Sequence, residues 1–172
     1  PYQELLSKPS IILIKDIVKK ISSLDRVENV LSLLDVPLLE NNPNISLSDV
    51  AENVETLNSD SPNLELAKRV FSSNDVYQNL LISEDLNTTA FQVTLKRNIN
   101  YENLINQRYA IYDLETPDKE QRLININELI EQEKNMVSIE DEKLVSSMRS
   151  LLESYQNFGE FFLGGGAMIT VD

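Results

Sequence analysis

The stretch of sequence that decides the fold class runs Thr88-Thr89-Ala90-Phe91-Gln92-Val93-Thr94-Leu95-Lys96. Its apolar residues Phe91, Val93 and Leu95 alternate with polar ones, which predicts a strand with one buried face. Residues 84–87, Glu-Asp-Leu-Asn, are typical of a turn, and residues 79–83 before them are expected to form the partner strand. A β-hairpin over 79–96 is therefore the best strand signal in the chain.

After this hairpin the sequence becomes helical in composition. Two helices are expected within 101–133, divided at Thr116-Pro117, because Pro ends a helix. They are predicted to pair as a helical hairpin. Another helix is predicted over 138–157, with Ser138 and Asp141 forming its N-terminal capping box. Residues 161–163 are expected to finish this half of the chain as a short strand.

Before the β-hairpin, local patterns predict a helix, a strand and two short helices. Apolar residues at steps of three and four indicate an amphipathic helix over 9–24. Residues 27–36 are rich in Val and Leu and stop at a Pro, which indicates a strand. The short helices are expected at 46–57 and 61–71, each capped by the serine that opens it.

Together these elements predict an α+β fold. The second half has the order strand, strand, helical insertion, helix, strand, which is most of a split β-α-β (ferredoxin-like) unit with an inserted helical hairpin. The first half has the order of the same unit without its opening strand. We therefore expect a truncated first lobe over 1–60 and a second lobe over 61–172, with the hairpin inserted at about 99–135. An unrelated α+β domain is the alternative on pattern alone.

Composition excludes several functional classes. The 172 residues contain no Cys and no His, so disulfides, thiolate nucleophiles, Ser-His-Asp relays and zinc sites built from nitrogen and sulfur ligands are excluded. With 28 acidic against 15 basic residues, the formal net charge of −13 opposes binding to nucleic acid and to anionic lipid surfaces. We expect no enzymatic activity, no cofactor, no metal and no nucleic-acid partner.

Three segments, in a fixed order, carry a family resemblance. They read Val27-Glu28-Asn29-Val30-Leu31-Ser32-Leu33-Leu34-Asp35-Val36-Pro37, Leu81-Ile82-Ser83-Glu84-Asp85 followed by the 88–96 strand, and Phe162-Leu163-Gly164-Gly165-Gly166-Ala167-Met168-Ile169. With the helical insertion between the second and the third, they resemble the exporters of the RND superfamily. Ala167 stands where these exporters typically have Pro. The resemblance extends over nearly the whole chain.

The resemblance implies that the chain is a soluble extracytoplasmic porter loop of a proton-driven transporter. Such a loop lies between the first and second transmembrane helices, on the periplasmic side of the inner membrane. Its partners would be the rest of the same transporter, with its transmembrane helices and second porter loop, and a hydrophobic or lipid-like substrate. The proton relay of these exporters lies in their transmembrane helices, so no coupling residue is carried over to this sequence.

The start of the chain, at Pro1 without an initiator Met or a signal-peptide pattern, leads us to expect a piece of a longer protein. A lobe without its opening strand would leave the 27–36 strand with an unpaired edge, which favours pairing with a second copy and a homo-oligomer. The alternative function is a free-standing ferredoxin-like module for ligand sensing or protein interaction. An enzyme using only carboxylates has no motif in its support.

Two sets of residues are candidate functional sites. Gly164, Gly165 and Gly166 are interpreted as a hinge, because consecutive glycines absorb backbone rotation at little cost; they lack the Lys-Ser/Thr continuation of a phosphate-binding loop. Tyr101, Tyr109 and Tyr112 are candidates for a groove that holds an apolar substrate, with ordinary packing of the helical hairpin as the alternative.

The acidic groups Glu140-Asp141-Glu142 and Glu52 with Glu55 are interpreted as exposed helix faces, since no calcium-loop pattern surrounds them.

Overall fold

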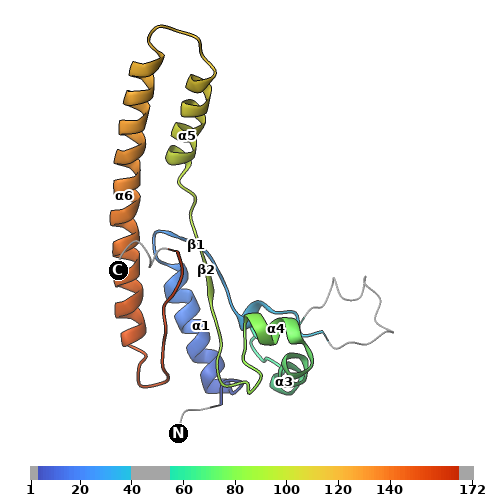
Figure 1. Ribbon diagram of the computed structural model, residues 1–172. Helices are drawn as coiled ribbons and strands as arrows, with labels where there is room; N and C mark the ends of the chain where they lie inside the picture. The colour runs from blue at the N-terminus through green and yellow to red at the C-terminus, as the bar shows by residue number, and fades with distance from the viewer. Residues whose placement is uncertain (1–3, 40–54, 167–172) are drawn as a thin grey trace. The chain divides into compact units, whose positions relative to one another are not determined.

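The computed structural model describes residues 4–39 and 55–166. The chain divides into two compact units, Pro1–Thr94 and Leu95–Asp172, and each is described by itself (Figure 1). The predicted helix at 46–57 lies almost entirely outside the described residues.

The first helix of unit 1, α1 (Lys8–Ser22), confirms the helix expected at 9–24. Ser7 caps it, because its side chain accepts a hydrogen bond from the Ser10 backbone N–H, and Pro9 occupies the first turn, where its missing N–H costs nothing. The buried face consists of four isoleucines at helical spacing: Ile11, Ile14, Ile17 and Ile21.

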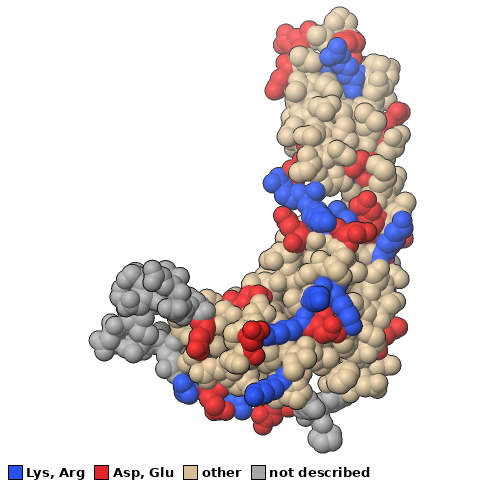
Figure 2. Space-filling model, turned by 180° about the vertical axis from the view of Figure 1, so that it is seen from behind, with Lys and Arg blue, Asp and Glu red and all other residues tan. Residues whose placement is uncertain are grey.

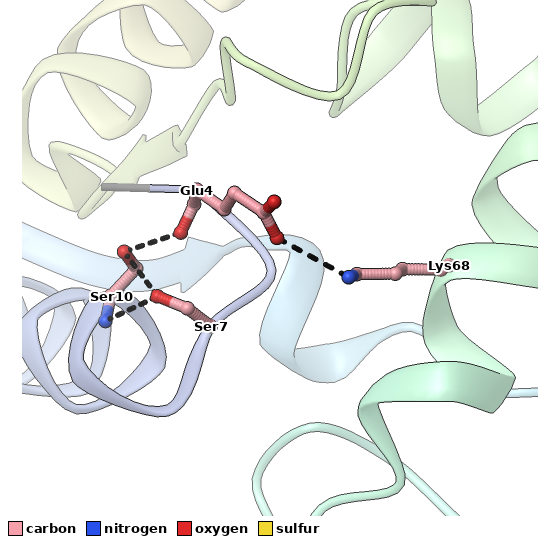
Figure 3. A network of polar contacts seen from close by, with 4 residues as sticks. All are labelled: Glu4, Ser7, Ser10 and Lys68. Atoms are coloured by element: carbon pink, nitrogen blue, oxygen red, sulfur yellow. Dashed lines mark hydrogen bonds and ion pairs between the residues drawn. The ribbon is translucent and has the colours of Figure 1, made fainter. Parts of the chain in front are cut away.

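A polar network fixes the entry to α1 and connects it to Lys68, farther along unit 1 (Figure 3). The Ser10 hydroxyl donates to the Glu4 backbone carbonyl at 2.7 Å, and the Ser7 and Ser10 hydroxyls lie 3.0 Å apart. The Glu4 carboxylate in turn accepts from the Lys68 ammonium at 3.3 Å. This exposed ion pair links segments 64 residues apart in the sequence, but contributes little stability by itself.

The strand expected at 27–36 is shorter in the structure. Strand β1 covers Val27–Leu31, and a 3₁₀ helix, η1 (Leu33–Asp35), follows. The reason is a reciprocal cap at the fully buried Ser32: its hydroxyl accepts from the Leu34 N–H at 3.2 Å, and the Asp35 carboxylate accepts from the Ser32 N–H at 2.9 Å. These local bonds replace the ladder bonds that a longer strand would make.

The helix expected at 61–71 is present as α3 (Leu64–Ser73), but Asn63 rather than Ser61 caps it, through a 3.0 Å bond from the Leu66 N–H to the Asn63 side chain.

The prediction of a strand at 79–83 is wrong over the first part of that segment. Helix α4 (Asp75–Leu80) occupies that segment, started by the Asn74 side chain, which accepts from the Val76 N–H at 3.0 Å. A local cap thus overrides the strand-like composition of the segment.

The β-hairpin expected over 79–96 is reduced to a single bridge after α4. Ile82 and Thr89 form an isolated antiparallel bridge around the turn at 84–87, in which Leu86 has a positive φ of 55°. Strand β2 (Gln92–Leu95) lies within the predicted alternating stretch, as expected, but its partner is β1. The two strands form a two-stranded antiparallel sheet.

The core of unit 1 joins residues from both sides of the boundary expected after residue 60. Its most buried side chains include Leu33, Leu57, Ala67 and Phe71, each with no exposed surface. Phe71 also meets the Tyr77 ring edge to face, with ring centroids 6.0 Å apart. Because α3 and the bridge at Ile82 share this core with α1 and η1, the chain divides after Thr94 and not after residue 60.

Unit 2 contains the expected helical hairpin. Helix α5 (Ile99–Tyr112) packs against α6 (Lys119–Glu153), and Figure 1 shows the two side by side, joined through 113–118. The break expected between 133 and 138 is absent, and Ser138 with Asp141 does not cap a new helix, because α6 runs without interruption for 35 residues. No Pro or Gly occurs between 119 and 153 to stop it.

Residues 161–163 are not a strand in the structure. Helices together with a two-stranded sheet confirm the α+β class for the described part of the chain.

Candidate functional site

The glycines proposed as a hinge follow residues 161–163, which belong to no helix or strand. A Cβ atom placed at Gly164, Gly165 or Gly166 would meet no atom within 4 Å, so steric crowding does not require glycine at any of the three positions. Gly165 differs from the other two because its φ of +131° lies in a region that L-residues rarely adopt. The structure therefore gives a backbone reason for glycine at Gly165 only.

The three candidate tyrosines all lie on α5. Tyr101 is half-buried, whereas Tyr109 and Tyr112 are 60% and 52% exposed. The Arg108 guanidinium lies 5.9 Å from the centre of the Tyr109 ring, within range of a weak cation–π contact at an exposed site. Tyr109 and Tyr112 are three residues apart and so lie on neighbouring parts of the helix surface. The substrate groove stays a prediction.

Asn98 joins the beginning of α5 to the middle of α6. Its side-chain oxygen accepts from the Tyr101 N–H at 2.9 Å and so caps α5, while its side-chain nitrogen donates to the Glu133 carboxylate at 2.9 Å. Beside it, Arg97 donates two hydrogen bonds, of 2.8 and 2.6 Å, to the Glu102 carboxylate. Sequence reasoning missed Asn98, although an Asn directly before a helical segment is a typical N-cap signal.

Charged contacts also order the turn between α5 and α6. The Lys119 ammonium donates to the Tyr112 carbonyl at 2.6 Å, at the C-terminus of α5, where a cation is favoured. The Arg122 guanidinium donates to the Asp118 carboxylate at 2.6 Å. Hydrogen bonds from the Thr116 side chain and from Arg122 hold the pKa of Asp118 below its ordinary value.

The outer face of α6 exposes large apolar side chains. Ile124, Leu129, Met136 and Ile139 are each about half exposed. A shallow open hollow on the same helix is lined by Ile124, Asn127, Glu128, Glu131, Gln132 and Asn135. None of the three candidate tyrosines lines it.

Acidic residues dominate this part of α6. Glu131 accepts a hydrogen bond from the Lys134 ammonium at 2.7 Å, which raises the pKa of Lys134. The triplet Glu140-Asp141-Glu142 lies farther along the helix. Glu52 lies outside the described residues. Over residues 4–39 and 55–166, no three His, Cys, Asp or Glu side chains are grouped as a metal site would require.

The face of the molecule seen in Figure 2 carries both acidic and basic side chains, and neither sign of charge covers that face alone. Within the described part of the chain, no helix combines the length and the apolar character needed to cross a membrane. Comparisons with protein-family models, with curated proteins and with solved structures find no match.

Proposed function

We propose that this chain is an extracytoplasmic porter domain of an RND-type transporter. The observation that carries the proposal is the order of the three segments that resemble RND exporters, at 27–37, 81–96 and 162–169, with a helical insertion between the second and the third. The helical hairpin of α5 and α6 supports it, because this hairpin fills the interval between those two segments.

In this function the domain makes and breaks no bond and needs no cofactor. It shapes a path for a lipid or another hydrophobic small molecule and moves with the rest of the transporter, at the inner membrane and on its periplasmic side. The finer fold proposal is that the sheet and helices belong to ferredoxin-like lobes that the remaining transporter completes. The α+β composition supports that proposal, and so does the sheet: within the described residues β1 and β2 pair only with each other, which leaves outer edges to which further strands can add.

The proposed roles of the candidate residues follow from this function. Gly165 is the main hinge residue of the 164–166 segment, supported by its positive φ. Tyr109 and Tyr112 offer exposed aromatic surface to an apolar substrate, and the half-buried Tyr101 lies on the same helix.

The test is to determine where the full-length gene product resides and whether it exports. The encoding gene is expected to specify an apolar span of about 20 residues on each side of this domain. The full-length protein should fractionate with membranes, and protease added to spheroplasts should cleave this domain. A gene product without apolar spans that fractionates as a soluble protein would contradict the proposal and leave the alternative, a free-standing ligand-sensing or protein-interaction module.

A further inference from the structure

Part of the exposed surface of α6 has the spacing of a helix-docking stripe. Leu129, Gln132, Met136 and Ile139 recur at steps of three, four and three residues, the spacing of a and d positions over two heptads. The three apolar members are exposed by 47%, 52% and 52%, respectively. We call these four residues the α6 stripe. Their neighbours Ile126 and Ile130, in contrast, are buried.

The surroundings of the α6 stripe are strongly acidic. Residues 128–142 contain six carboxylates and one ammonium group, that of Lys134, which already contacts Glu131 at 2.7 Å. Glu128 and Glu142 occupy the positions that flank such a stripe, where coiled coils carry the charges that select a partner. Both are exposed.

The negative charge around the α6 stripe discriminates among the partners that could cover it. A second copy of the chain would bring Glu128 and Glu142 against the same carboxylates of its partner, and like charges across an interface are unfavourable. An anionic lipid surface is opposed for the same reason. A helix with apolar residues on one face and Lys or Arg beside them would cover the stripe and neutralise its flanks.

We propose that the α6 stripe binds an amphipathic, basic α-helix of another protein. The partner helix contributes apolar side chains over Leu129, Met136 and Ile139, and its cations lie beside Glu128 and Glu142. Gln132, the polar member of the stripe, favours one register, because a polar group in an apolar seam is satisfied in few alignments. The proposal does not depend on the transport function.

The test uses two designed helical peptides that share leucines at their a and d positions. One carries lysines and the other glutamates at the flanking positions, and each is titrated with the 172-residue chain and followed by fluorescence anisotropy. The lysine peptide is expected to bind, and more weakly as salt rises, whereas the glutamate peptide is not. The double variant Leu129→Gln with Met136→Gln should weaken binding of the lysine peptide by about tenfold or more.

Two further variants separate the contributions. Glu128→Gln with Glu142→Gln should weaken the lysine peptide and reduce the salt dependence. Val76→Gln with Leu80→Gln changes two apolar side chains of α4 that are more exposed than those of the α6 stripe, at 61% and 67%, and should leave binding unchanged. Circular dichroism establishes that each variant retains its helix content.

Three results would overturn the proposal. Equal binding of both peptides would show that charge does not select the partner, and lysine-peptide binding that survives the Leu129→Gln, Met136→Gln change would show that the α6 stripe is not the site. If sedimentation velocity shows a dimer of the unmodified chain that the same double variant dissociates, the occupant is a second copy.

Discussion

Asn98 is expected to stabilise the helical hairpin, because its side chain bonds to both of its helices. It makes two bonds of 2.9 Å with different parts of its amide: the oxygen caps α5 at the Tyr101 N–H, and the nitrogen holds the Glu133 carboxylate of α6. Asn98→Ala removes both. Asn98→Asp keeps an equally good capping oxygen but replaces the donor that faces Glu133 with a second carboxylate.

The two contributions have similar expected sizes. Loss of an N-cap side chain costs about 1 kcal/mol, and loss of a hydrogen bond to a charged group costs about 1.5 kcal/mol. Asn98→Ala should therefore destabilise the hairpin by about 2.5 kcal/mol, and Asn98→Asp by at least about 1.5 kcal/mol because the two carboxylates also repel. Glu133→Gln combined with Asn98→Asp should restore most of that loss, since the new amide can donate to the carboxylate at position 98.

The assay is native-state hydrogen exchange of the α5 amides, because a chain with two units need not unfold in one step. Protection of the Tyr101 and Glu102 amides should fall most in Asn98→Ala. If Asn98→Asp exchanges as slowly as the unmodified chain, the bond to Glu133 contributes nothing and the reasoning is refuted. Failure of Glu133→Gln to rescue Asn98→Asp would show that charge repulsion is not the cause.

Three further predictions concern the core, the β-turn and the glycine segment. Phe71→Ala should destabilise unit 1 by about 3–5 kcal/mol, because the ring is fully buried, while Val76→Ala on the exposed surface should stay within about 0.5 kcal/mol of the unmodified chain in the same urea titration. Hydrogen bonds from the Ser83 hydroxyl and from Asn87 lower the pKa of Asp85, so the stability that the ionised carboxylate contributes is present above the ordinary pKa of 3.8 and is lost as the pH falls through the lower pKa of the folded state. Asp85→Asn should therefore accelerate hydrogen exchange of the turn amides at pH 6, and by less as the pH drops below 3.8. A difference in exchange that stays constant with pH would exclude this linkage. Gly165→Val should add about 1–3 kcal/mol of backbone strain and impair export by the full-length protein at unchanged abundance; Gly164→Val is the matched control, and equal export by both variants would eliminate the hinge.

Sequence reasoning succeeded where the deciding interactions are local. Helix α1 was predictable because Pro9 and the isoleucine spacing act within a few residues, and the hairpin of α5 and α6 because Pro117 separates two helical patterns. Among the candidate site residues, the sequence singled out the glycine segment. It did not distinguish Gly165 from its neighbours, because φ is set by the path of the chain and not by the identity of the residue.

The errors arose where one local signal competed with another or with distant packing. Ser32 and Asp35 end β1 early by capping η1, and Asn74 starts a helix in a segment with strand-like composition. The division between the two units lies after Thr94 and not after residue 60, because Phe71 and Leu57 share a core with α1. No local sequence pattern indicates this long-range packing.

By itself, the sequence determined the helical character of most segments, the acidic charge and the absence of Cys and His chemistry. Only the tertiary structure decided that β2 pairs with β1, that Asn98 reaches Glu133, and that Leu129 and Met136 remain exposed while Ile126 and Ile130 are buried. Those four apolar side chains are alike in the sequence. Their different burial follows from the direction in which each leaves the α6 axis, since only one side of the helix faces α5.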